Sequence, residues 1–107
     1  MFAHTRAALA HFGAELRDTL PHLVVSVHAF GSRVRGDHRG DSDLDVLVVV
    51  RERTLELERS IIDLCVEHEQ RSGISFDPVI KDVATFDLER QRHTPFYQNV
   101  SAESIQI

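Results

Sequence analysis

The sequence predicts an α+β fold in which helices pack against one small sheet. Two observations indicate this class. Some stretches repeat apolar residues every three or four positions, as amphipathic helices do, and others are short β-branched runs bounded by glycine, serine or proline, as strands are. The chain has 107 residues, of which 42% are hydrophobic and 27% are charged, and these values are typical of one globular domain. We therefore expect residues 1–107 to fold as a single domain.

The first half of the chain contains one predicted helix and two predicted strands. Residues 3–20 have a helical apolar pattern, which Pro21 ends. The run LVVSVHAF, residues 23–30, precedes Gly31-Ser32 and predicts a strand that enters a tight turn. The run DVLVVV, residues 45–50, is too short and too rich in valine for a helix, so we expect a central strand covered on both faces. The apolar positions of the helix are Leu9, Phe12, Leu16 and Leu20.

The second half begins with a longer helix. Thr54 is its predicted N-cap and Ser72-Gly73 its predicted end, and Cys65 lies on its apolar face, where we expect a buried core thiol. The run ISFDPVI, residues 74–80, predicts a third strand. Its Pro78 has no amide hydrogen to donate, which places it where the strand edge is unpaired. A short helix over about residues 85–92 and an extended segment over residues 103–107 complete the predicted order.

Charge and hydropathy exclude several classes of protein. The net charge of −5 argues against non-specific binding to nucleic acid, because such proteins usually carry a basic face. No apolar run approaches the roughly 20 residues that span a bilayer. The N-terminal stretch MFAHTRAALAHFGAELRDTL lacks the uninterrupted apolar core of a signal peptide. We therefore expect a cytoplasmic protein that contacts neither membrane nor nucleic acid directly.

Two aspartates crowd the start of the predicted central strand. Side chains two apart in a strand share a face, so Asp43 and Asp45 point the same way, while Leu44 and Val46 point into the opposite layer. Two unit charges 4 Å apart repel by about 4 kcal/mol in a protein-like dielectric, so we expect a cation beside them. Oxygen ligands without nearby histidine or cysteine favour magnesium or manganese over zinc.

A third carboxylate and a turn complete the candidate site. Asp77 lies between apolar residues of the next predicted strand, where burial of an unpaired carboxylate is unfavourable. Three carboxylates on adjoining strands could hold two divalent ions, the arrangement that aligns both oxygens of an in-line phosphoryl displacement. Gly31 permits a turn that other residues make less readily, and Ser32 offers a hydroxyl and an amide to phosphate at the start of the next helix.

These residues form a spaced pattern of Gly31-Ser32, ten intervening residues and then Asp43-Leu44-Asp45, with Arg35-Gly36 inside the gap. The pattern resembles the signature of the minimal nucleotidyltransferases, a branch of the DNA polymerase β-like nucleotidyltransferase superfamily. The resemblance covers nearly the whole chain, and the tail TPFYQNVSAESIQI is similar to the closing helix and strand of that branch. Two departures are Val34, where the family often has alanine, and Pro78 after Asp77. The resemblance implies a polymerase β palm-like fold with a small mixed sheet of about four strands.

The resemblance also implies a metal-dependent transfer of AMP from ATP to a hydroxyl group. The residues that would hold the triphosphate or flank it are Gly31, Ser32, Arg33 and Arg35. The catalytic residues and ligands of two Mg²⁺ ions, with Mn²⁺ as an alternative, would be Asp43, Asp45 and Asp77. Of these, Asp77 would act as, or help to place, the base that activates the incoming hydroxyl.

Many members of this branch are antitoxins encoded beside a HEPN-domain ribonuclease, and they transfer AMP to a tyrosine hydroxyl of that toxin. The resemblance therefore implies a HEPN toxin as the partner and a toxin-antitoxin role. Two alternatives remain open at this point. The chain could be an antitoxin that neutralises its partner by binding alone, or a transferase that acts on a small molecule.

Other interpretations of the same residues are weaker. Asp41, Asp43 and Asp45 imitate an EF-hand loop, but Val46 stands where that loop needs glycine. Residues 31–36 lack the lysine and following hydroxyl residue of a P-loop. We assign Asp41 to a polar turn. The remaining polar residues close to the candidate site are expected to be structural or solvated, and they are His28, His38 and Lys81.

Overall fold

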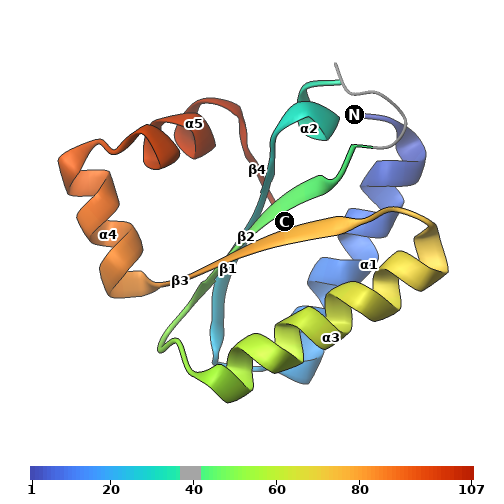
Figure 1. Cartoon of the computed structure of the whole chain (residues 1–107), viewed down its shortest axis with the longest axis horizontal. Coiled ribbons are helices and arrows are strands. Elements are labelled where there is room, and N and C mark those ends of the chain that lie inside the picture. The colour runs from blue at the N-terminus through green and yellow to red at the C-terminus, as the bar shows by residue number, and fades with distance from the viewer. Residues whose placement is uncertain (37–41) are drawn as a thin grey trace.

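The structure is a computed structural model that describes residues 1–36 and 42–107. Within these residues one sheet forms the centre, with strand order β3-β2-β1-β4 (Figure 1). β1 (Val24–Phe30) pairs antiparallel with β2 (Leu44–Val50) and with β4 (Ile105–Gln106), while β2 pairs parallel with β3 (Phe76–Asp82). This mixed sheet, with its packed helices, confirms the predicted α+β class.

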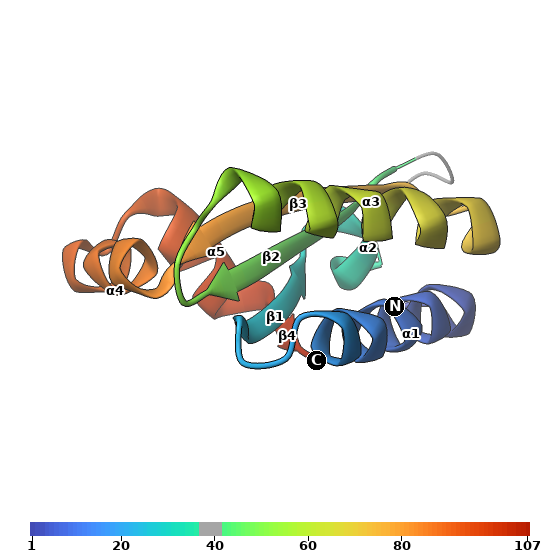
Figure 2. The same cartoon turned by 90° about the horizontal axis from the view of Figure 1, so that it is seen from below.

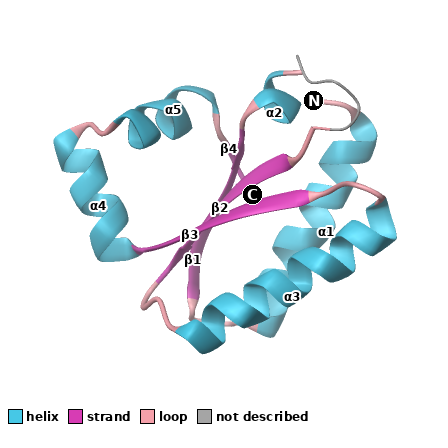
Figure 3. Ribbon diagram, in the orientation of Figure 1, coloured by secondary structure: helices cyan, strands magenta, loops and turns pink. Residues whose placement is uncertain are grey.

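Helices lie on both faces of the sheet, as two perpendicular views show (Figures 1 and 2). α1 (Ala3–Thr19) and α3 (Leu55–Ser72) cover one face, and α4 (Val83–Arg92) and α5 (Pro95–Glu103) cover the other. α2 (Ser32–Arg35) is a single turn between β1 and β2 (Figure 3). Among the described helices, none combines the length and the apolar character that crossing a bilayer requires.

The alternation of side chains along β2 divides the core into two parts. Val46 and Val48 belong to the cluster that includes the fully buried Phe12 of α1. Leu47 and Val49 belong to the cluster on the α4 and α5 side. β2 is therefore covered on both faces, as its continuous apolar run predicts.

α3 begins and ends where the sequence predicts. The side chain of Thr54 accepts a hydrogen bond from the Leu57 N–H at 3.1 Å, which satisfies one of the free donors at the start of the helix. Gly73 ends the helix in the left-handed region, with φ 74°. Cys65 is 4% exposed, and burial raises the pKa of its thiol to about 12. The predicted core position of this cysteine is confirmed.

Element boundaries in the last third of the chain differ from the prediction. The third strand spans Phe76–Asp82 rather than residues 74–80, because Asp82 also serves as the N-cap of α4 and accepts a hydrogen bond from the Thr85 N–H at 2.7 Å. α4 therefore starts at Val83 rather than near residue 85. α5 was implied by the family resemblance and not by the residue pattern. Pro78 lies on an edge strand, as predicted.

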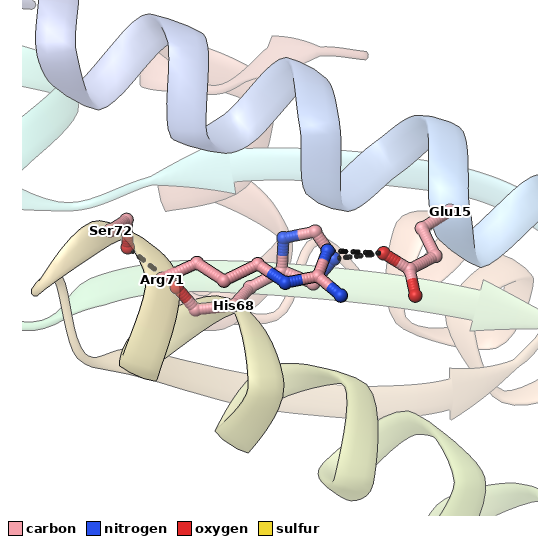
Figure 4. A network of polar contacts seen from close by, with 4 residues as sticks. All are labelled: Glu15, His68, Arg71 and Ser72. Carbon is pink, nitrogen blue, oxygen red and sulfur yellow. Dashed lines mark hydrogen bonds and ion pairs between the residues drawn. The ribbon is translucent and has the colours of Figure 1, made fainter.

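A polar network joins α1 to α3 (Figure 4). The buried His68 places Nε2 2.6 Å from Glu15 Oε2, and Arg71 Nη1 donates to the same oxygen at 3.4 Å. A groove of about 510 Å³ lies between the two helices and is bordered by these side chains. The groove belongs to the helical layer on the face of the sheet opposite to α4 and α5.

Candidate active site

Three segments of the chain meet at one end of the sheet. β1 ends at Phe30, and the first residues of the antiparallel β2 lie beside that end. β3 runs parallel to β2, so it starts at the same end. Asp45 lies opposite Phe30 on one side and opposite Asp77 on the other. The Leu44 N–H donates a hydrogen bond to the Ser75 carbonyl at 2.8 Å, which ties the start of β2 to the segment entering β3.

The predicted aspartates differ in burial. Leu44 and Val46 point into the core with α1 and α3, so Asp45 between them faces the layer of α4 and α5, as predicted. Asp45 is partly buried, whereas Asp43 and Asp77 are exposed. Asp77 avoids the cost of burying a carboxylate between apolar neighbours, because β3 is an edge strand and leaves this end open.

Asp45 is where the negative charges concentrate. Its pKa is raised from the ordinary 3.8 to about 6, first by burial, then by the charge and a hydrogen bond of Asp77, and then by the charge of Asp43. The positive charge of Arg35 acts in the opposite direction. A hydrogen bond between two carboxyl groups requires a shared proton. The repulsion that the sequence predicts is present, but Asp77 contributes more to it than Asp43 does.

The donor chemistry of the three aspartates fits a hard divalent cation. Carboxylate oxygens are the ligands that magnesium and manganese prefer, and a cation beside Asp45 would offset the repulsion from Asp77 and Asp43. Across residues 1–36 and 42–107, no three or more histidine, cysteine, aspartate or glutamate side chains are already grouped as a metal centre. The role of Asp43, Asp45 and Asp77 as metal ligands therefore remains a prediction.

Gly31 is required at its position for two reasons. Its φ of 85° and ψ of −168° lie in a region that only glycine occupies readily. A Cβ atom at Gly31 would also overlap the carboxylate of Asp45 and lie 3.1 Å from its Cγ. The predicted special turn is confirmed, and the structure adds its reason, which is the close approach of the Asp45 side chain to the backbone of the turn.

Ser32 opens α2, but α2 is too short to act as a source of helix dipole. The N–H groups of Val34 and Arg35 both donate to the Gly31 carbonyl at 3.1 Å, and the helix ends after four residues. Because the dipole grows with the number of aligned peptide units, the predicted attraction of phosphate to a helix N-terminus is weak here. The Gly31 N–H and the Ser32 hydroxyl remain as local donors.

The two arginines predicted to flank the phosphate site point in different directions. Arg33 is 8% exposed, and its guanidinium donates to the Ser42 carbonyl and, at 3.2 Å, to Thr5 Oγ1 on α1. These contacts hold α2 against α1 and against the segment that leads into β2. Arg35 is 44% exposed and close enough to Asp45 to influence its pKa. The positive charge of Arg35 therefore acts directly on Asp45.

Glu103, the last residue of α5, lies in this site and was missed by the sequence analysis. Its carboxylate accepts a hydrogen bond from the Gly31 N–H at 3.2 Å. It also accepts from Arg35 Nη1 at 3.1 Å on Oε1 and 2.9 Å on Oε2. The two partners are 72 and 68 positions away along the chain, so no local pattern could have revealed these contacts.

Lys81 differs from its predicted state as a solvated surface amine. Its side chain is 20% exposed, and Nζ lies 2.6 Å from Glu89 Oε2 and 4.5 Å from the ring centroid of Phe96. The reason is that α4 and α5 fold back over this face of the sheet. The ring of Phe96 packs edge-on against Phe30, the neighbour of Asp45, with 5.7 Å between centroids.

His28 has a structural role, as predicted. Its Nε2 lies 2.9 Å from Ser26 Oγ, and burial lowers the pKa of its imidazole. Two further predictions, a polar turn at Asp41 and a structural or solvated His38, fall outside the described residues.

Comparison with known sequences identifies one family for most of this chain. The sequence model of a family described as a nucleotidyltransferase domain matches residues 12–101. A Methanocaldococcus jannaschii protein with an assigned protein adenylyltransferase activity is 35% identical over 66 residues, which make up 61% of this chain and 63% of that protein. The alignment thus spans less than two thirds of this relative.

Solved structures share the fold. One, of a protein assigned as a minimal nucleotidyltransferase, is 33% identical with a TM-score of 0.60, and the match covers 94% of this chain and 92% of that one. Another is a tri-AMPylated Shewanella oneidensis HEPN toxin in complex with an MNT antitoxin. The matched chain there is 17% identical with a TM-score of 0.55, covering 94% of this chain and 69% of that one.

Proposed function

This chain belongs to the nucleotidyltransferase domain family, and we propose that it is a metal-dependent adenylyltransferase that moves AMP from ATP to a hydroxyl group. One observation carries the proposal. The Gly31-Ser32 turn lies against Asp45, and Asp45 lies opposite Asp77, so segments far apart in the sequence form one polar corner of the fold. The assigned activity of the M. jannaschii relative supports AMP as the transferred group.

The triphosphate of ATP would lie along the Gly31 turn. The Gly31 N–H and the Ser32 hydroxyl are donors there, and Arg35 adds a positive charge on the same side. Arg33, which also flanks the turn, is oriented toward Thr5 on α1, so its contribution would be to hold α2 in place.

The carboxylates of Asp43, Asp45 and Asp77 would hold two Mg²⁺ ions, or Mn²⁺ ions. Such ions, when bound, neutralise the charge of the phosphate oxygens. The acceptor oxygen forms a bond to the α-phosphorus, the bond from that phosphorus to the β-phosphate oxygen breaks, and pyrophosphate leaves. The exposed carboxylate of Asp77 would accept the proton of the attacking hydroxyl or place the group that does so.

The acceptor that we propose is a tyrosine hydroxyl of a HEPN toxin, which makes this chain an antitoxin. Two observations support a protein acceptor. Asp43 and Asp77 are exposed, so a side chain on a large partner can reach them. The fold is shared with a chain of the complex between a tri-AMPylated HEPN toxin and an MNT antitoxin. We further propose that residues 1–107 act as one domain in the cytoplasm.

The test is to incubate the protein with the product of the gene next to its own, ATP and magnesium, and to weigh that product by intact mass spectrometry. We expect mass increments of one or more AMP units. Asp45→Asn should abolish them, while Asp63→Asn, a matched change at an exposed position on α3, should leave them unchanged.

Each other outcome separates a rival from the proposal. A tight complex without added mass would mean that the chain neutralises its partner by binding alone. Transfer that is complete with a double Asn variant of Asp43 and Asp45 would rule out the assigned chemistry. If ATP is consumed in the presence of a small hydroxyl compound and not in the presence of the partner protein, the chain would be a small-molecule transferase.

A further inference from the structure

Glu103 binds the Gly31 N–H and the Arg35 guanidinium, two groups that the proposed function assigns to binding of the triphosphate. Its carboxylate takes the Gly31 N–H on Oε1 and faces Arg35 with both oxygens, at distances of 2.9 to 3.2 Å. The side chains of Arg35 and Glu103 are 44% and 25% exposed, so the contact is accessible to solvent and to ligands. Within the described part of the chain, an internal anion therefore lies where the proposed triphosphate would bind.

A carboxylate and a phosphate group compete for such donors because both are oxygen anions that accept from an N–H group and from a guanidinium. A backbone N–H has one hydrogen with a fixed direction and makes one well-aligned hydrogen bond. The Gly31 N–H therefore cannot be donated fully to Glu103 and to a phosphate oxygen at the same time. Triphosphate at this turn requires that Glu103 give up at least that hydrogen bond.

The backbone around Glu103 is held in place by the residues before and after it. On one side, Val100 of the same helix is 2% exposed and packs with Leu47 and Val49. On the other side, β4 pairs with β1, with Gln106 opposite His28. The backbone of Glu103 is thus held from both directions, so rotation of the side chain is the movement that frees the two donors.

We propose that Glu103 is an internal competitor of the nucleotide that sets the affinity of the site for ATP. The inference rests on the proposed function. Without nucleotide, Glu103 occupies the Gly31 N–H and Arg35. With nucleotide, the triphosphate replaces it there, and the freed carboxylate turns away from the phosphates. A role as a simple tether between α5 and α2 is the alternative, and it predicts the opposite effect of removing the charge.

The experiment measures the affinity of MgATP by calorimetry for the full chain and for Glu103→Gln. Because a partly exposed ion pair is weak, we expect Glu103→Gln to bind MgATP about 2- to 10-fold more tightly. The matched control is Glu58→Gln, which removes the ion pair between Glu58 of α3 and Arg53, a residue that precedes this helix. That pair has similar exposure, 54% and 22%, but lies after the far end of β2. It should leave the affinity unchanged.

A second measurement, the amide resonance of Gly31 in NMR spectra, reports the contact directly. In the nucleotide-free protein Glu103→Gln should shift this resonance and Glu58→Gln should not. MgATP affinity that is equal or weaker in Glu103→Gln would overturn the competitor role and leave the proposed function standing. Absence of MgATP binding in both the parent protein and Glu103→Gln would overturn the two together.

Discussion

Replacing Asp45 with asparagine should stabilise this protein in the absence of metal. The parent chain must place an ionised Asp45 beside Asp77 and Asp43 above neutral pH, and the first cause of its raised pKa is burial. Asparagine has nearly the same shape and no charge, so it removes both the repulsion and the burial penalty of the charged form.

The magnitude follows from the pKa of Asp45, which rises from 3.8 in an unstructured chain to about 6 in the fold. Without solvent screening, a pKa shift of this size would lower the folding stability of the ionised form by roughly 3 kcal/mol. Asp45 is only partly buried, and solvent screening reduces the effect to about 1 kcal/mol. For a domain of this size that corresponds to an increase in Tm of about 4–8 °C.

The sign of the pH dependence is fixed by the direction of the shift. The folded state of the parent chain binds the Asp45 proton more tightly than the unfolded state does, so its stability falls as pH rises from about 4 to 6. Asp45→Asn does not titrate at this position. The advantage of the variant should therefore be near zero at pH 4, grow up to pH 6 and stay constant above it.

The assay is urea unfolding of both proteins in EDTA from pH 4 to pH 8, followed by circular dichroism. Asp63→Asn on α3 is the matched control and should show no pH-dependent difference. In a second series without EDTA, added manganese should stabilise the parent protein and not Asp45→Asn. A variant that is less stable than the parent at pH 7 without metal, or one with the same difference at pH 4 and pH 7, would refute the electrostatic explanation.

Further changes probe the turn, the caps and the core. Gly31→Ala should lower the free energy of unfolding by about 2–4 kcal/mol. Gly36→Ala should lower it by only about 1 kcal/mol, because Gly36 has a similar φ of 82° but no atom within 4 Å of an added Cβ. Equal losses in urea unfolding would mean that the contact with Asp45 is unimportant. Thr54→Ala should lose about 1 kcal/mol of stability in the same assay, and no loss would argue against its capping role. Burial raises the pKa of the Cys65 thiol to about 12, so this thiol should resist alkylation at pH 8 until urea unfolds the chain. Rapid modification of the native protein, seen by mass spectrometry, would contradict its burial.

Much of the fold could be predicted because its signals are local. Thr54 and Gly73 delimit α3 through cap chemistry that involves only adjacent residues. The valine run of β2 predicts a doubly covered strand because burial on both faces leaves no alternation. The end of β3 was placed incorrectly because Asp82 belongs both to a strand and to a helix cap, and strand propensity does not distinguish the two roles.

The candidate site could be predicted in part for the same reason. The spacing between Gly31-Ser32 and the Asp43-x-Asp45 pair spans a single turn and the start of a strand, so it can be recognised along the chain. Arg33 and Arg35 are only two positions apart, yet they point in different directions, because one is enclosed by α1 and the other is not. Sequence periodicity does not determine which of two neighbouring arginines a distant helix will cover.

The sequence by itself determined the α+β class, most of the element boundaries, the special turn at Gly31 and the aspartate-rich start of the central strand. Only the tertiary structure decided that Asp77 lies opposite Asp45, that Arg33 turns toward α1 and that Glu103 reaches the Gly31 turn. The physical reason is range. Helical and strand periodicity, caps and turns act over a few residues, whereas strand register and contacts between remote side chains are fixed by how the layers pack.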